Sequence, residues 1–247
     1  AFPNAQGRLL AVVRVLRQGD KYLFETEGAT REKVFQNLFR FTFAGDFFVE
    51  DMSEGPFWFE IFGPKDDVYN PNAAEKWPEA VAYELPYGAG YFMASGLVEK
   101  FREFLTVENH CLVISDELYE TLRIESGIPR YGVDMDDTTI VPELGLDGLI
   151  SYNKGCYIGQ EIIARIHFRG HVAKELAGLI LSEPAAVGSG LQSKDGKNAG
   201  RITSVTFTPK LERTIALAFV RCDHLESGTA LVFGAGPPVN APALPFG

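Results

Sequence analysis

The sequence predicts an α+β fold followed by a small β-barrel. Residues 1–172 alternate between strand patterns and helix patterns, whereas from about Ala173 short strand patterns are separated by Gly, Asp, Asn and Pro. A chain of 247 residues is long enough for two such domains. We therefore predict an α+β domain over residues 1–172 and a C-terminal β-barrel domain over residues 173–247.

The α+β part begins with a predicted hairpin and helix. Residues 9–17 and 22–26 are rich in β-branched, aromatic and aliphatic residues, and Gly19-Asp20 between them favours a turn. Residues 30–41 have apolar residues at helical spacing, with Thr30 as a candidate cap. A packed helix should therefore follow the hairpin.

The remaining elements are predicted in the same way. Residues 47–52 and 57–62 resemble a strand pair, and residues 64–78, with three prolines, a loop. A helix is expected over 117–126, capped by Ser115 or Asp116 and ended by Gly127, and another over 158–166. The predicted barrel strands are 178–181, 202–207, 215–220 and 229–233, with a turn at Asp195-Gly196 and an extended tail over 234–247.

Composition limits the function classes. A formal net charge of -10 opposes non-specific binding to nucleic acid or anionic lipid, and no apolar run approaches the roughly 20 residues of a membrane span. Three widely spaced cysteines do not predict a disulfide framework, so a reducing compartment is expected. We expect a soluble protein without nucleic-acid or membrane partners.

The stretch from Lys154 to Glu161 is the most informative, because it predicts a thiol at the start of a helix. A helix N-terminus and the ammonium of Lys154 would both favour the thiolate of Cys156, and hence reactivity or metal affinity. The alternative is that Cys156 is a small buried apolar residue.

A second candidate is Glu125, which shares a predicted helix face with Leu118 and Leu122. A carboxylate on an apolar face needs hydrogen-bond donors, and paired ring N–H and amine donors of a ligand would suit it. The alternative is a surface ion pair with Arg123 or Arg130. His167 and His171 are four residues apart, but Gly170 interrupts the helix between them, so we expect no metal site there.

The stretch Lys154-Gly155-Cys156-Tyr157-Ile158-Gly159-Gln160-Glu161 resembles the signature of the YgfZ-like folate-binding branch of the glycine-cleavage T-protein superfamily. The Gln6-Gly7-Arg8 turn and the segments 199–204 and 215–218 are similar to the same family. The resemblance implies a T-protein-like folate-binding domain with mixed sheets and packed helices before the β-barrel. The family's opening segment before the Gln-Gly-Arg turn is expected to be missing.

The resemblance also implies site residues and partners. Glu125 would orient the pterin of tetrahydrofolate, Tyr131 and Arg165 would contact the folate, and Cys156 with Lys154 would perform a redox, sulfur or partner-facing step. Iron–sulfur client or assembly proteins are the implied partners. The implied compartment is the cytoplasm, or the mitochondrial matrix in a eukaryote. Because the chain is acidic, the anionic folate tail would need a local basic patch.

One position argues against aminomethyl transfer. T-proteins that perform this reaction have an aspartate in the segment that resembles residues 27–34, and Val34 stands in its place unless Glu32 substitutes from a shifted register. Valine can neither accept a proton nor stabilise a cation. We predict an accessory protein for assembly or repair of iron–sulfur enzymes. The alternatives are a tetrahydrofolate-dependent aminomethyltransferase and a scaffold with a decayed folate pocket.

Overall fold

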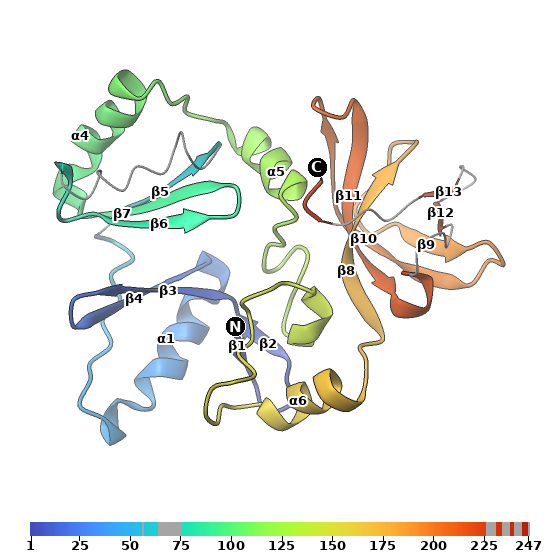
Figure 1. The fold of residues 1–247 in the computed structure, drawn as a ribbon, viewed down its shortest axis with the longest axis horizontal. Coiled ribbons are helices and arrows are strands. Elements are labelled where there is room, and N and C mark those ends of the chain that lie inside the picture. Colours follow the sequence, from blue (N-terminus) through green and yellow to red (C-terminus); the bar gives the residue numbers. More distant parts are fainter. Residues whose placement is uncertain (56, 64–75, 226–230, 234–237, 240–243, 247) are drawn as a thin grey trace. The chain divides into compact units, whose positions relative to one another are not determined.

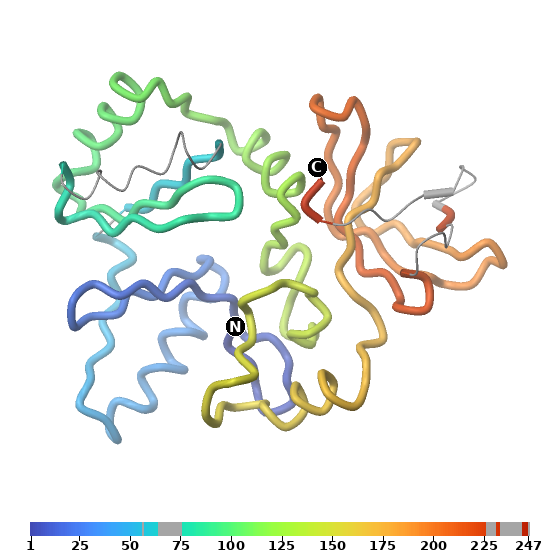
Figure 2. Tube along the Cα trace, viewed as in Figure 1, coloured from blue at the N-terminus to red at the C-terminus, as the bar shows by residue number. Residues whose placement is uncertain are grey.

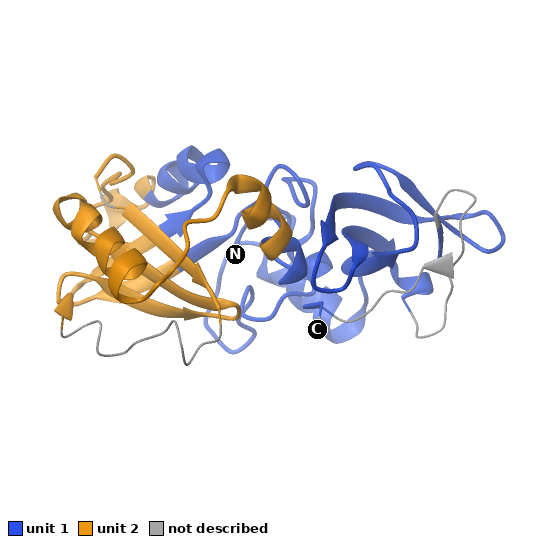
Figure 3. Cartoon of the chain, turned by 90° about the horizontal axis from the view of Figure 1, so that it is seen from above, with its two compact units in different colours: residues 1–14, 25–38, 123–247 blue, residues 15–24, 39–122 orange. Residues whose placement is uncertain are grey.

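The computed structural model describes residues 1–55, 57–63, 76–225, 231–233, 238–239 and 244–246. The chain forms two compact units (Figure 3): unit 1 comprises residues 1–14, 25–38 and 123–247, and unit 2 comprises residues 15–24 and 39–122. The predicted domain boundary between residues 172 and 173 falls inside unit 1 and stays a prediction. Within the described residues, no helix has the length and apolar character needed to cross a membrane.

Unit 1 contains a six-stranded antiparallel sheet (Figure 1). Its strands, in spatial order, are β13 (Pro238–Val239), β12 (Leu231–Phe233), β9 (Gly190–Ser193), β10 (Asn198–Thr208), β11 (Arg213–Arg221) and β8 (Lys174–Leu181). The predicted strands in β8, β10 and β11 are confirmed, and each extends beyond its predicted bounds. The Asp195-Gly196 turn is also confirmed, because Gly196 has φ 78° and the Ser193 N–H donates to Lys197 O at 2.9 Å.

Apolar residues bury this sheet on both faces. Ile215 and Leu217 of β11 pack in a cluster with Leu9, whereas Ala216 and Ala218 face a second cluster. Residues on a strand alternate between faces, so burial on both sides produces the unbroken apolar run of β11.

The other elements of unit 1 come from distant parts of the chain. They are β1 (Phe2–Pro3), β2 (Leu9–Ala11) and α6 (Gln160–Arg169). Four further elements begin in one unit and end in the other: β3 (Val13–Gln18), β4 (Lys21–Thr26), α1 (Arg31–Phe39) and α5 (Asp116–Glu125). The predicted hairpin and following helix are confirmed, since β3 and β4 form a two-stranded sheet and α1 begins at Arg31.

Unit 2 contains the three-stranded antiparallel sheet β5 (Phe57–Phe62), β7 (Gly88–Met93) and β6 (Val81–Leu85). Phe101 of α4 (Val98–Glu103) is fully buried against this sheet. The glycines of β7 are required by packing: a Cβ at Gly90 would lie 1.9 Å from the Tyr83 ring.

The predicted strand over residues 47–52 is wrong. These residues have no regular structure, and β5 pairs with β7 instead. Phe48 is 99% exposed, so the apolar pattern there does not report burial. The predicted loop falls mostly on residues 64–75, outside the described residues, as does most of the predicted tail. Phe246 of that tail is buried, and its N–H donates to Glu125 O at 2.9 Å.

Helix α5 ends as predicted, at a left-handed glycine. Gly127 has φ 70°, its N–H donates to Ile124 O at 3.0 Å, and the Ile128 N–H donates to Arg123 O at 2.8 Å. These bonds satisfy carbonyl groups that the helix leaves without partners.

Arg123, near the end of α5, is 1% exposed and forms a buried ion pair with Asp134 at 2.9 Å. Its guanidinium also donates to Ser204 Oγ at 2.9 Å and to Ile128 O at 3.0 Å. A buried charge is tolerated when its donors are satisfied in this way.

We expect Arg123→Gln to destabilise the chain by about 3–5 kcal/mol, because it leaves the Asp134 carboxylate buried without its cation. Urea unfolding would measure the loss. Arg102→Gln, on the exposed side of α4, removes the same charge and should change stability by about 0.5 kcal/mol or less. Equal losses of stability for the two substitutions would contradict the stabilising role of the buried Arg123–Asp134 ion pair.

Candidate functional site

Three polar residues from two distant segments are joined by hydrogen bonds in unit 1. Tyr131 donates its backbone N–H to Glu27 Oε1 at 2.9 Å, and Lys33 Nζ of α1 donates to the Tyr131 hydroxyl at 2.9 Å. Lys33 also lies 5.0 Å from the Tyr131 ring centroid and 3.9 Å from Asp137. We call Glu27, Lys33 and Tyr131 the polar cluster. Tyr131 is therefore the one predicted site residue that the structure joins to further functional candidates.

The environment of the cluster shifts two pKa values upward. Burial raises the pKa of the Glu27 carboxyl, although the Tyr131 N–H and nearby arginines act in the opposite direction. The hydrogen bond to Tyr131 raises the pKa of the largely exposed Lys33 ammonium, which therefore stays protonated. The cluster thus contains the Glu27 carboxylate, whose charge is costly to bury, and the Lys33 ammonium, which its hydrogen bond to Tyr131 fixes in place.

Sequence reasoning missed Glu27 and Lys33 as site residues. Both lie in the 27–34 segment that was compared with the transferases, but their partner Tyr131 is about a hundred residues away. The residues next to Glu27, Lys33 and Tyr131 in the sequence therefore do not predict this contact.

Val34 is 5% exposed, so it belongs to the buried face of α1. Glu32, the expected substitute from a shifted register, faces solvent and accepts a hydrogen bond from Gln36 Nε2 at 2.8 Å. The structure therefore has a buried apolar side chain at position 34.

Glu125, the predicted pterin residue, lies apart from the polar cluster's hydrogen bonds. Its Oε1 accepts the Thr208 hydroxyl of β10, and its backbone oxygen holds Phe246. The alternative of a surface ion pair with Arg123 or Arg130 does not hold for Arg123, because Arg123 is buried against Asp134; for Arg130 it stays open. These contacts give Glu125 a role in joining α5 to the sheet and tail, and its folate role stays a prediction.

Cys156 and Lys154 lie on an exposed loop before α6. The predicted position of the thiol at the start of the helix is wrong: α6 begins at Gln160, four residues after Cys156. Lys154 lies 5.2 Å from the Tyr157 ring centroid, and Arg165 is on the exposed side of α6. The alternative that Cys156 is a buried apolar residue is also wrong, because the side chain is exposed.

The two glycine-containing motifs of the sequence contact each other (Figure 2). A Cβ at Gly159, which has φ 83°, would lie 2.4 Å from Asn4 O, and one at Gly7 would lie 3.3 Å from Ile162. Asn4 Oδ1 in turn accepts the N–H groups of Gln6 and Arg8 at 2.9 and 3.0 Å. The Asn4–Arg8 turn therefore fixes the beginning of α6 and with it one end of the Cys156 loop.

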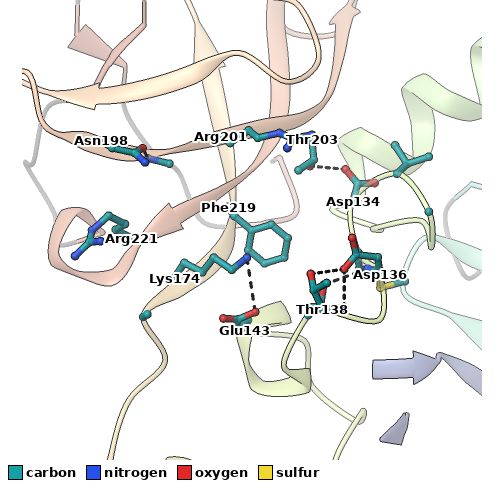
Figure 4. Close-up of a pocket in the computed structure, with 16 residues that line it drawn as sticks. Asp134, Asp136, Thr138, Glu143, Lys174, Asn198, Arg201, Thr203, Phe219 and Arg221 are labelled. Atoms are coloured by element: carbon teal, nitrogen blue, oxygen red, sulfur yellow. Dashed lines mark hydrogen bonds and ion pairs between the residues drawn. The ribbon is translucent and has the colours of Figure 1, made fainter. Parts of the chain in front are cut away.

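A pocket of about 550 Å³ lies elsewhere in unit 1, between the loop after Tyr131 and the ends of β8, β10 and β11 (Figure 4). Lys174 Nζ lies 3.9 Å from Glu143 Oε2, and Asp136 accepts the Thr138 hydroxyl at 2.6 Å. Burial raises the pKa of Glu143, whereas hydrogen bonds from Thr138 lower the pKa of Asp136.

These opposite shifts predict opposite pH dependences of stability. The folded chain holds the Glu143 proton more tightly than the unfolded chain, so ionised Glu143 destabilises the fold. Glu143→Gln should therefore unfold at a higher temperature than the wild type at neutral pH. This difference should vanish as the pH falls through the raised pKa to below the ordinary 4.5.

Asp136→Asn is the matched comparison. Ionised Asp136 stabilises the fold because its folded-state pKa is lowered, so this variant should be less stable at neutral pH and should match the wild type in acid. Thermal unfolding of both variants across pH measures the two effects. If both substitutions changed the melting temperature at neutral pH in the same direction, the opposite pKa shifts of Glu143 and Asp136 would be contradicted.

The sequence is similar to known proteins in its C-terminal half. Residues 174–243 match the family model of the glycine cleavage T-protein C-terminal barrel domain. Aminomethyltransferases of Xanthomonas axonopodis and Picosynechococcus are 31% and 34% identical over 128 and 137 residues. Each match covers 51% of this chain and 34% or 36% of the relative. The chain thus spans about a third of the length of the curated relatives it matches.

The fold comparison extends over almost the whole chain. The crystal structure of the glycine cleavage system aminomethyltransferase T from Bartonella henselae has a TM-score of 0.82 at 16% identity, covering 99% of this chain and 74% of that one. This likeness confirms the predicted α+β fold with its C-terminal barrel. The barrel match, the aminomethyltransferase relatives and the shared fold show that the chain is similar to glycine cleavage T-proteins in its barrel domain and in its fold.

Proposed function

We propose that the chain binds a reduced folate without transferring an aminomethyl carbon, and that it assists iron–sulfur enzymes. The observation that carries the first part is the buried Val34 on α1, next to the protonated Lys33. Neither side chain can take a proton from a reacting amine at neutral pH. On this basis, the start of α1 does not supply the base that transfer of a carbon would require.

The cluster has the chemistry that a reduced pterin requires. A pterin presents a ring N–H beside an amino group, and a carboxylate accepts such donors as charge-assisted hydrogen bonds. Glu27 is a half-buried carboxylate fixed through one oxygen by the Tyr131 N–H. A ligand with two hydrogen-bond donors would offset part of the cost of burying the Glu27 charge. We therefore propose Glu27 as a pterin contact in addition to the predicted Glu125.

Cys156 supports the second part of the proposal. The thiol is exposed on a loop with Lys154, and the contacts of Gly7 and Gly159 fix the end of that loop. Such a thiol is available to a protein partner, and the signature around it resembles that of the YgfZ-like proteins. We place this activity in a reducing compartment, the cytoplasm or the mitochondrial matrix, where the three free cysteines would persist.

Calorimetric titration of tetrahydrofolate tests the folate part. Glu27→Gln should weaken binding by about 1–3 kcal/mol, because the amide keeps the shape but loses the charged acceptor. Glu32→Gln, on the solvent side of α1, is the control and should bind as the wild type does. Glu125→Gln tests the other predicted pterin residue in the same way.

A folded wild-type chain that does not bind tetrahydrofolate would exclude the folate proposal in favour of a scaffold with a decayed pocket. Release of ammonia and methylene-tetrahydrofolate from an aminomethyl-lipoyl donor would instead establish the alternative suggested by the names of the relatives, an aminomethyltransferase.

Replacement of Cys156 by serine tests the iron–sulfur part. In cells that lack this protein, wild-type chain should restore the activity of an iron–sulfur enzyme, and Cys156→Ser should fail to restore it while binding tetrahydrofolate normally. Cys111→Ser, which removes a half-buried thiol, is the control and should restore activity. Full activity with Cys156→Ser would show that the thiol is not needed.

A further inference from the structure

The pocket of Figure 4 has a wall of three cations that the proposed pterin contacts do not use. Lys174, Arg201 and Arg221 form this cationic wall, at the ends of β8, β10 and β11. Arg221 pairs directly with Lys174 across β8 and β11, and Phe219 pairs with Arg201 across β10 and β11. Residues 219 and 221 share a face of β11, so all three cations lie on one sheet face.

This arrangement is costly unless anions compensate it. Like charges directly opposite each other on neighbouring strands, as Lys174 and Arg221 are, destabilise a sheet, and Arg201 is a diagonal neighbour of Arg221. Such a concentration of cations is also unexpected in a chain with a net charge of -10. The pairing of these residues therefore suggests that they serve a ligand.

The protein neutralises only part of the wall. Arg221 pairs with the exposed Asp223 at 3.2 Å, and Lys174 lies 3.9 Å from Glu143. Lys174 is also held 4.4 Å from the Phe219 ring centroid, which fixes its direction. Among the described residues, Arg201 has no ion pair or side-chain hydrogen bond, and its guanidinium is exposed.

We infer that this pocket binds a small ligand with two or more carboxylates, held by Arg201 together with Lys174 and Arg221. Guanidinium groups match carboxylates in geometry, and a volume of about 550 Å³ suits a small molecule. Such a ligand could be the glutamate tail of a folate or a free dicarboxylate. The first source rests on the proposed folate binding, whereas the second does not.

The opposite wall favours separated carboxylates over a phosphate group or nucleic acid. Asp136 lines the pocket, and its lowered pKa keeps it ionised, so a compact dianion beside it would be repelled. Single charges several ångströms apart can each meet one cation of the wall. Because the three cations lie on three different strands, they fit a ligand whose carboxylates are separated from one another rather than joined in one group.

Calorimetry with γ-glutamyl-glutamate and glutarate as probes tests the site directly. We expect Arg201→Gln to weaken binding of both probes by about tenfold, the loss of one charge-assisted contact. Lys194→Gln removes the same charge from an exposed turn of the same sheet and should leave affinity unchanged. The melting temperature of each variant would confirm that it is folded.

A second titration identifies the source of the carboxylates. If the tail of a folate occupies the pocket, tetrahydrofolate with three glutamates should bind more tightly than the form with one, and Arg201→Gln should abolish this difference. If neither folate binds but the free probes do, the proposed folate function fails and the inferred site stands.

The inference is overturned if the probes do not bind and the two folates bind equally. It is also overturned if inorganic phosphate binds as tightly as the dicarboxylates, or if Lys194→Gln weakens the probes as much as Arg201→Gln.

Discussion

The buried ion pair of Arg123 and Asp134 is the contact on which the rest of unit 1 depends. Asp134 is 2% exposed and accepts hydrogen bonds at both oxygens: Oδ2 from Arg123 and the Arg130 N–H, Oδ1 from the hydroxyls of Thr203 and Ser204. With its lone pairs used in this way, the carboxylate compensates the cost of its own burial. The pair thereby fixes the end of α5, the loop around Asp134 and the middle of β10 to one another.

The register shift in β10 is explained by its hydrogen bonds to Asp134 of this ion pair. The register with β11 shifts between Ile202 and Ser204, which lets the neighbouring residues Thr203 and Ser204 both reach Asp134. In a regular strand, two successive side chains would point to opposite faces. The loop that the ion pair holds carries Tyr131 on one side of Asp134 and Asp136 on the other. The polar cluster and the pocket of Figure 4 thus each take residues from a single loop that one carboxylate holds.

The sequence predicts the elements whose signals are local. The apolar runs of β8, β10 and β11 and the glycine stop of α5 depend on neighbouring residues alone, and each is where the pattern indicated. By contrast, β7 is not predicted, because glycines replace apolar residues where Tyr83 of β6 packs on Gly90. The contact between Glu27 and Tyr131 cannot be predicted from spacing, since it joins segments about a hundred residues apart. Glu125 illustrates the same limit, because its partner Thr208 lies on the sheet.

Under the proposed function, Glu27 decides whether a bound folate is only held or also reacts. Lys33 stays protonated and its neighbour Val34 offers no acceptor. Within the polar cluster, the Glu27 carboxyl is therefore the group whose raised pKa brings it closest to proton transfer at neutral pH. Its Oε1 is already bonded to the Tyr131 N–H, which stabilises the ionised form and fixes the carboxylate in place. A ligand that donates to Glu27 would strengthen this preference for the ionised form. Binding would therefore lower the pKa of Glu27, and the cluster would hold its ligand without taking a proton from it.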